Sequence, residues 1–173
     1  MPVPPRPKPK TCRVHAFFDG QSLFKAAERA FGHRWPNFDP FKLAEAVTKG
    51  EPDRLLEKVH FYTGVHEASE DPHWYGFWTN KLNALQRHGA HIVRRNLRYS
   101  QQPVEISPGK FAMRRIGREK GIDLCLALDL VRLARRREYD VAVIFSQDQD
   151  LAEAVREVKD ISCLLYTSPS PRD

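Results

Sequence analysis

The sequence predicts an α/β fold in which a central parallel sheet is covered by helices on both faces. Short apolar runs rich in β-branched and aromatic residues alternate with longer segments that have helical spacing. This alternation favours parallel strands joined by right-handed crossovers. A chain of 173 residues has the length of one domain with tails. In such sheets, ligands bind beyond the carboxyl ends of the strands.

Turn and cap signals place the elements along the chain. Strands are expected at 14–18, 58–62, 91–95 and 141–145. Helices are expected at 22–31, 40–50, 72–89, 124–133 and 151–158. Asp39 and Asp71 each precede a proline, which combines an N-cap with the residue that best fits the first helical position. The stripe of Trp74 and Trp78 on the third helix is interpreted as core.

Two later segments are less regular. Residues 96–118 are predicted to be irregular or to form a hairpin. The helix at 124–133 carries leucine or valine around nearly its whole circumference, so we expect burial on several sides, including Leu124 and Leu128.

Net charge, apolar runs and cysteine spacing limit the classes of function. The net charge of +6 favours an anionic partner such as nucleic acid, although a basic surface that serves only solubility remains an equal alternative. No apolar run approaches the roughly 20 residues that span a bilayer, so no membrane association is expected. Three cysteines without C-x-x-C spacing argue against a disulfide framework or a zinc ribbon, and a reducing cytoplasm fits best.

Carboxylates follow the predicted strands at the same edge of the sheet. Asp19 ends the first strand, Asp148 and Asp150 follow the strand at 141–145, and Asp123 begins the apolar helix. Acids gathered in this way repel one another unless a hard cation neutralises them, and Mg²⁺ or Mn²⁺ prefers such oxygen ligands. A metal held there can activate water and offset the charge of a phosphate.

Each acid also has a structural alternative. Asp19 can shape a turn, Asp123 can cap a helix, and Asp148 and Asp150 can open the last helix. Asp129 lies about 120° around the helix from Asp123, so we expect it to support the site from outside or to serve the fold.

Basic residues crowd the segment before the acidic helix. Between positions 94 and 120 they are Arg94, Arg95, Arg98, Lys110, Arg114, Arg115, Arg118 and Lys120. Of these, Arg94, Arg95, Arg114, Arg115 and Lys120 are the candidates for contact with a phosphate backbone. An ordinary solvated loop is the alternative. Tyr99 and Phe111 can stack on bases, but packing of the segment on the domain is the preferred interpretation for both.

Three blocks of the sequence resemble a known family. FFDGQSLF at 17–24, REKGIDLCLALDLVRLA at 118–134 and YDVAVIFSQDQDLAEAVREV at 139–158 are similar to the NYN domain, a branch of the PIN-like nuclease superfamily with bacterial members. The resemblance implies a three-layer α/β/α fold and a metal-dependent ribonuclease with an acidic site. The acids that match the family pattern are Asp19, Asp123, Asp148 and Asp150.

The resemblance also implies roles and shows departures. Asp19, Asp123 and Asp148 would bind metal, Asp150 would complete the shell, and Ser22 or Ser146 would orient water or phosphate. Many members have asparagine where this chain has Ser22, and glycine where it has Gln147, which lacks glycine's freedom at positive φ.

The resemblance divides the chain into three parts. Residues 1–12 form a proline-rich basic arm, and residues 13–161 form the domain. Residues 162–173 resemble translated sequencing-adapter read-through, so we expect a non-native tail and a domain truncated by an edge strand.

Three functions follow as hypotheses. The leading one is an endoribonuclease that uses Mg²⁺ or Mn²⁺, with RNA as its partner. The second is a regulatory module that binds RNA or a protein without cleavage, and retained RNA affinity without metal-dependent products would identify it. The third is a small-molecule enzyme such as a hydroxylase, although the chain has neither a G-x-G-x-x-G loop nor an iron-ligand pattern. A homodimer is left open.

Overall fold

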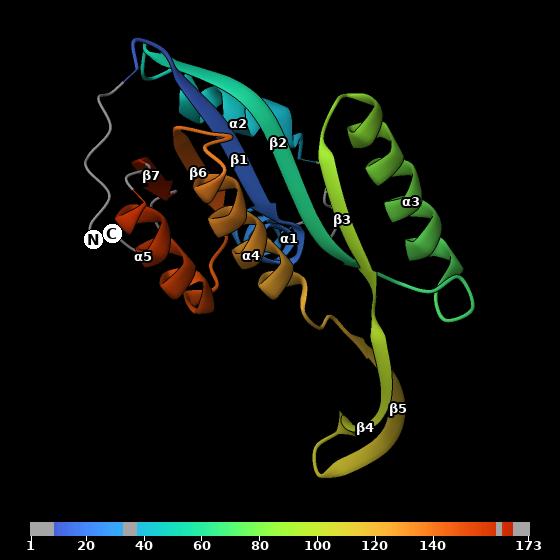
Figure 1. Ribbon diagram of the computed structural model, residues 1–173. Coiled ribbons are helices and arrows are strands. Elements are labelled where there is room, and N and C mark those ends of the chain that lie inside the picture. The colour runs from blue at the N-terminus through green and yellow to red at the C-terminus, as the bar shows by residue number, and fades with distance from the viewer. Residues whose placement is uncertain (1–8, 33–37, 162–163, 168–173) are drawn as a thin grey trace.

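A five-stranded parallel sheet forms the centre of the molecule in the computed structural model, which describes residues 9–32, 38–161 and 164–167 (Figure 1). The strand order is β3-β2-β1-β6-β7. The strands are β1 (Cys12–Asp19), β2 (Arg54–Val65), β3 (His91–Asn96), β6 (Val141–Phe145) and β7 (Leu164–Thr167). The predicted α/β fold with a central parallel sheet is confirmed. The first eight residues of the predicted arm lie outside the described residues.

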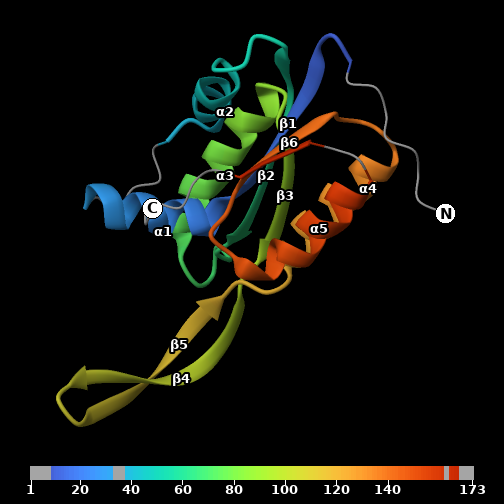
Figure 2. The same ribbon diagram turned by 90° about the vertical axis from the view of Figure 1, so that its left-hand side faces the viewer.

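Helices cover both faces of this sheet, as Figure 2 shows edge-on. On one face lie α1 (Gly20–Phe31), α2 (Pro40–Thr48) and α3 (Pro72–Arg87), and on the other lie α4 (Ile122–Arg135) and α5 (Ala152–Asp160). A short 3₁₀ helix, η1 (Gln149–Leu151), precedes α5. Among the described helices, none combines the length and the apolar character needed to cross a membrane.

The cap signals of the sequence correspond to real helix starts. The Asp39 carboxylate accepts hydrogen bonds from the backbone N–H groups of Phe41 and Lys42, and the Asp71 carboxylate accepts one from Trp74. These bonds satisfy donors that the first turn of a helix leaves free. Both helices therefore begin where the sequence predicts.

The side chains of β1 alternate between two hydrophobic cores. Val14, Ala16 and Phe18 belong to the core beneath α1, α2 and α3, whereas Phe17 belongs to the core beneath α4 and α5. β1 is buried along almost its whole length, and all five residues of β6 are buried. The two strands are neighbours at the centre of the sheet, which fixes the position of the loops that follow them.

The apolar helix α4 is buried on fewer sides than its sequence suggests. Leu126, Leu130 and Leu133 are buried, but Leu124 and Leu128 are each 61% exposed. Because α4 packs against the sheet, η1 and α5, the two leucines four residues apart fall on its outer face. The expectation that they are buried was wrong.

The basic segment forms a hairpin that projects from the body of the molecule in both views (Figures 1 and 2). It consists of β4 (Arg98–Ser107) and β5 (Lys110–Arg118), paired in antiparallel register. Tyr99 packs at its base, where its hydroxyl lies 3.0 Å from Nδ1 of His66. Phe111 is 65% exposed near the tip, so the packing role preferred for it was wrong.

The open edge of the sheet beside β6 is occupied. Leu164–Thr167 form β7, which pairs with β6 in parallel from Val141 to Ile144. The expectation that these 173 residues lack an edge strand is therefore wrong. The origin of residues 162–173 stays a prediction, and most of that segment lies outside the described residues.

Candidate active site

The predicted acids lie at the carboxyl edge of the sheet, at the point where the order in which strands are added reverses. From β1 the chain adds β2 and β3 on one side, and then crosses to β6 on the other side. Phe18 of β1 is paired with Phe145 of β6, so Asp19 and Ser146 are the next residues on neighbouring strands. Ligands of open α/β sheets bind at such a switch point.

Asp19 is held rigidly at the end of β1. Only 3% of the residue is exposed, and it is the N-cap of α1. Its Oδ1 accepts a hydrogen bond from the backbone N–H of Ser22 at 3.0 Å, and its Oδ2 accepts one from the Ser146 hydroxyl at 2.9 Å. Gly20 makes this turn feasible, because a Cβ there would lie 2.9 Å from the ring of Phe61.

The loop after β6 is tied to Asp19 through Ser146. The Ser146 hydroxyl also accepts a hydrogen bond from the backbone N–H of Asp148 at 3.1 Å. Asp148 is the N-cap of η1 and accepts a hydrogen bond from the backbone N–H of Asp150 at 2.9 Å. Gln147 adopts no positive φ, because Arg137 is the only described non-glycine residue that does. The departure from glycine therefore imposes no backbone strain.

Asp123 completes the group from the first turn of α4. Burial raises the pKa of Asp123 to about 7, with further increases from the charges of Glu119, Asp19 and Asp148 and from a hydrogen bond with Asp148. Burial and neighbouring carboxylates both disfavour the charged form of a carboxyl group. The structure thus brings together Asp19, Asp123 and Asp148.

Asp150 and Ser22 lie at the margin of this group. Asp150 is exposed, and its carboxylate makes no hydrogen bond or ion pair to a described residue. Ser22 contributes its backbone N–H to Asp19, whereas its hydroxyl makes no hydrogen bond to a described residue. Asp129 belongs to the fold, because its carboxylate accepts a hydrogen bond from the buried Tyr62 hydroxyl at 3.0 Å.

Glu119 is a member of the acidic group that the sequence reasoning missed. Its Oε1 accepts a hydrogen bond from the backbone N–H of Ile122 at 2.8 Å, so it caps α4. It also has the largest effect of any neighbouring charge on Asp123. A Cβ on Gly64 would lie 2.8 Å from its Cγ, so glycine is needed for this close approach. None of the sequence patterns above marks a glutamate two residues before the N-cap, which is Gly121 here.

The acidic group suits a hard divalent cation by its chemistry. Carboxylate oxygens are the ligands of Mg²⁺ and Mn²⁺, and a cation would offset the neighbouring charges that, together with burial, raise the pKa of Asp123. Within the described ranges, however, no three or more His, Cys, Asp or Glu side chains are arranged to hold a metal ion. The donor set fits the metal by its chemistry and not by the present arrangement of its side chains.

The basic candidates do not form one surface. Arg94 is paired with Thr63 and Arg95 with Gly64, so their side chains leave opposite faces of β3. The Arg95 guanidinium lies against Gly121, at the start of α4, where Nη1 is 3.0 Å from the position of a Cβ. Lys120 is exposed beside it. Both residues therefore adjoin the acidic group.

The other two candidates lie on the hairpin. Arg114 and Arg115 are successive residues of β5, so they point to opposite faces of the hairpin. Arg115 Nε donates to Glu70 Oε1 at 2.7 Å, and its guanidinium lies 5.6 Å from the centre of the Tyr99 ring. Arg115 therefore fastens the hairpin to the domain, whereas Arg114 is exposed.

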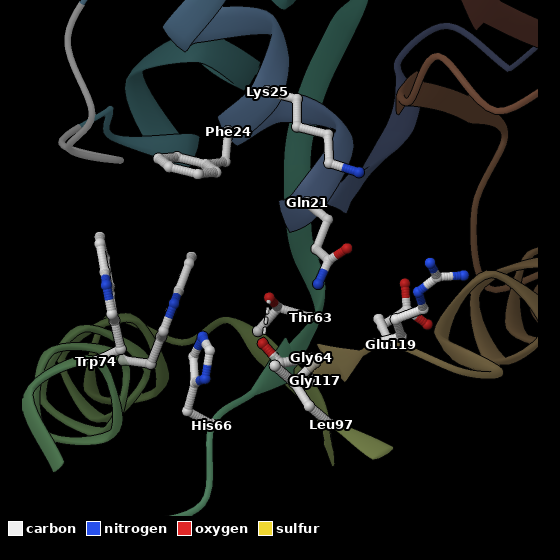
Figure 3. Close-up of a pocket in the computed structure, with 12 residues that line it drawn as sticks. Gln21, Phe24, Lys25, Thr63, Gly64, His66, Trp74, Leu97, Gly117 and Glu119 are labelled. Atoms are coloured by element: carbon white, nitrogen blue, oxygen red, sulfur yellow. Dashed lines mark hydrogen bonds between the residues drawn. The ribbon is translucent and has the colours of Figure 1, made fainter. Parts of the chain in front are cut away.

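A pocket of 580 Å³ adjoins the acidic group and shares Glu119 with it (Figure 3). Its walls come from the start of α1, the end of β2, α3 and the base of the hairpin. They include Gln21, Phe24, Lys25, Thr63, Gly64, His66, Trp74, Trp78, Leu97, Gly117, Arg118 and Glu119. Trp78 is buried, as expected for core, but Trp74 is only partly buried and forms part of the pocket wall.

Comparison with known proteins identifies the family. The chain is similar over 96% of its length to the solved structure of a protein of unknown function from Vibrio parahaemolyticus, with a TM-score of 0.59, 15% sequence identity and 86% of that chain covered. This likeness shows the fold alone. No curated protein matches the chain. The family model of the NYN domain matches residues 13–171, nearly the whole length, and the chain therefore belongs to the NYN domain family.

Proposed function

We propose that this protein is a divalent-metal-dependent endoribonuclease. The observation that carries the proposal is the convergence of Asp19, Asp123 and Asp148 at the switch point of the sheet, where burial and, to a smaller extent, the charges of Glu119, Asp19 and Asp148 raise the pKa of Asp123 to about 7. The NYN domain family generally has a PIN-like nuclease fold, which is consistent with this assignment. Fold alone does not establish chemistry, so the proposal rests on the site.

Asp19, Asp123 and Asp148 would hold Mg²⁺ or Mn²⁺, with Asp150 as the outer member of the set. A cation bound there would supply a water of lowered pKa and would offset the charge of the scissile phosphate. Ser146 keeps the Asp19 carboxylate oriented, because its hydroxyl connects Asp19 Oδ2 to the Asp148 backbone. Glu119 keeps the first turn of α4, and therefore Asp123, in position.

The basic residues near the acids would bind the RNA backbone. Arg95 and Lys120 flank the start of α4, and we expect them to contact backbone phosphates near the acidic group. Arg94 and Arg114 are exposed and would extend this contact toward α3 and along the hairpin. Ser22, with no described hydrogen bond from its hydroxyl, would orient a water or a phosphate oxygen.

A second candidate function is RNA binding without hydrolysis. One observation favours it: the described acids are not arranged to hold a metal ion as they stand. A protein of this kind would keep the basic contacts and form no products with any metal. The nuclease is the better-supported function, because a module that only binds an anion gains nothing from a group of buried and half-buried acids.

The cysteines bear on the cellular location of the protein. Cys12 and Cys125 are free thiols, which is typical of a reducing cytoplasm. We infer a cytoplasmic protein on this basis. Self-association stays a prediction, and the exposed Leu124 and Leu128 on α4 are the residues through which we would test it.

The test is cleavage of a labelled single-stranded RNA in Mg²⁺, in Mn²⁺ and in EDTA. The matched control is the Asp19→Asn, Asp148→Asn double variant, which keeps both side-chain shapes and the cap geometry. We expect products from the wild-type protein only with metal, and none from the double variant. Intact RNA in every lane, with RNA binding retained, would favour the second candidate.

A further inference from the structure

The pocket beside the acidic group is lined in part by aromatic residues that hydrolysis of a phosphodiester does not require. A metal and a phosphate need oxygen ligands and cations, yet this pocket has an aromatic wall that a phosphate does not use. Figure 3 shows Phe24 and Trp74 on one side, Glu119 on the other, and Gln21 and Thr63 between them. The pocket therefore extends from the acids toward a flat apolar surface.

The aromatic wall is built from two helices. Phe24 of α1 and Trp74 of α3 meet edge to face, with ring centres 6.3 Å apart at 67°. Trp74 also makes an edge-to-face contact with Phe77, with ring centres 5.4 Å apart at 79°. Phe77 in turn packs against Trp78, with ring centres 5.6 Å apart. Trp78 is buried in the core, so this row of rings fixes the orientation of Trp74.

The polar part of the pocket has unused hydrogen-bonding capacity. The Gln21 amide lines the pocket and makes no hydrogen bond to any described residue, so both its N–H₂ and its carbonyl are available to a ligand. Lys25, one turn further along α1, is exposed at the pocket with no described ion pair. His66, by contrast, is fixed by its 3.0 Å contact with the Tyr99 hydroxyl.

We propose that this pocket takes one unpaired nucleobase of an RNA strand, stacked on Trp74 beside Phe24 and read at its edge by Gln21. This rests on the proposed function, because the strand would place its phosphates at the acidic group. The volume of 580 Å³ is within the range of about 300 to 1,000 Å³ for pockets that enclose small ligands. Aromatic faces and amide groups are the means by which proteins bind splayed-out bases of single-stranded RNA.

The position of the pocket defines which RNA is a substrate. Glu119 borders both the pocket and the acidic group, so the inserted base belongs to a nucleotide near the scissile phosphate. A base inside a duplex is stacked and paired and cannot enter without being flipped out. Single strands, loops and bulges are therefore bound, and a continuous duplex is excluded. Lys25 and Arg118 at the same pocket would hold the adjoining phosphates.

The experiment measures binding rather than cleavage, so that it is independent of the proposed chemistry. A fluorescent single-stranded RNA is titrated into the Asp19→Asn, Asp148→Asn protein, and an abasic residue is moved through the RNA one position at a time. We expect one position at which the abasic residue weakens binding by about tenfold, since stacking of one base contributes roughly 1 to 3 kcal/mol.

Variants then locate that position in the pocket. Trp74→Ala is expected to weaken binding about tenfold with intact RNA and to abolish the difference between intact and abasic RNA, whereas Trp74→Phe restores it. Tyr75→Ala is the matched control, because Tyr75 is the next residue of α3 and does not line the pocket. Thermal unfolding of each Trp74 and Tyr75 variant checks that the fold is kept. The abasic series is measured with every pocket residue unsubstituted, so its result does not depend on how a pocket variant folds.

The outcomes separate the two proposals. An affinity that is equal at every abasic position, or an abasic effect that persists in Trp74→Ala, overturns the pocket assignment even if the wild-type protein cleaves RNA. A single sensitive position that is coupled to Trp74 supports the pocket even if no cleavage is found with any metal.

Discussion

The central strands carry ionisable groups in their middle and at their carboxyl ends, and the two regions differ in what burial does to them. Inside the strands, His15 of β1 and His60 of β2 form a buried pair, with 3.1 Å between His15 Nδ1 and His60 Nε2. His15 Nε2 lies 3.2 Å from Glu57, and the Phe17 ring stacks on His60 at 4.6 Å. At the carboxyl ends, Asp19, Asp123 and Asp148 gather with Glu119.

Burial disfavours charge in both groups, but the two groups differ in their neighbours. Burial, with smaller effects of His15, His91 and Lys58, lowers the pKa of His60 to about 3, so this ring is uncharged at neutral pH and packs as an aromatic group. At the carboxyl edge, burial raises the pKa of Asp123, and the charges of Glu119, Asp19 and Asp148 raise it further. The histidine pair is therefore structural, and the acidic group is suited to receive a cation.

The largest effect is expected from Asp148 and tests which acids belong to the site. Asp148→Asn should lower the rate of RNA cleavage by about a thousandfold, since loss of a metal ligand removes several kcal/mol of charge stabilisation. Asp150→Asn, two residues away and exposed, should change the rate less than tenfold. Single-turnover cleavage compares them, and equal losses would contradict the geometry.

Ser146→Ala should have the next largest effect. The Ser146 hydroxyl joins Asp19 to the Asp148 backbone, and loss of such an orienting group typically costs about 10- to 100-fold in metal affinity or activity. The measurement is the cleavage rate as a function of Mn²⁺ concentration, with the exposed Ser100→Ala as control. An unchanged metal dependence would show that Asp19 needs no support.

The buried histidine pair predicts a loss of stability in acid. The folded pKa of His60 is about 3 and the unfolded value is about 6.5, so the unfolded state binds the proton first as the pH falls. His60 should therefore lower the free energy of unfolding by about 2 kcal/mol between pH 7 and pH 5.

The measurement is urea unfolding at pH 7 and pH 5. His60→Phe keeps an aromatic ring on Phe17 and removes the titrating group, so the difference between the two pH values should shrink by about that amount. His15, whose pKa burial also lowers, would account for part of the remainder. A difference as large as in the wild type would mean that other groups cause the acid sensitivity.

The smallest effect is a gain in stability. Asp123→Asn removes one charge from a group of like charges, so without metal at pH 8 it should raise the free energy of unfolding by about 0.5 to 1 kcal/mol, a value limited by solvent screening. Thermal unfolding in EDTA measures it. Glu153→Gln, an exposed residue in the first turn of α5, serves as the control. A loss of stability would show that Asp123 serves the fold.

Local signals made much of the fold predictable. The Asp-Pro pairs at 39–40 and 71–72 determine where two helices begin, because the cap and the proline act within one turn. Asp19 and Asp148 could be placed at one edge because parallel strands share their carboxyl ends. These inferences need only the nearest residues and the hand of the crossovers.

The remaining features depend on tertiary packing. Periodicity shows that α4 is apolar but not which elements flank it, so the exposure of Leu124 and Leu128 could not be read from the sequence. Trp74 and Trp78 share one stripe and both line the pocket, yet Trp78 is buried and Trp74 is only partly buried, a difference that helical spacing does not show. The influence of Glu119 on Asp123 likewise requires the close approach at Gly64.

Mn²⁺ binding decides whether the acidic group at the carboxyl edge of the sheet holds a cation. Calorimetric titration of Mn²⁺ into the wild-type protein at neutral pH, with the Asp19→Asn, Asp148→Asn variant in parallel, asks whether the acidic group holds a cation. We predict saturable binding with release of protons in the wild type, because Asp123 must ionise, and no binding in the variant. Equal binding by both proteins, or none by the wild type, would contradict the account.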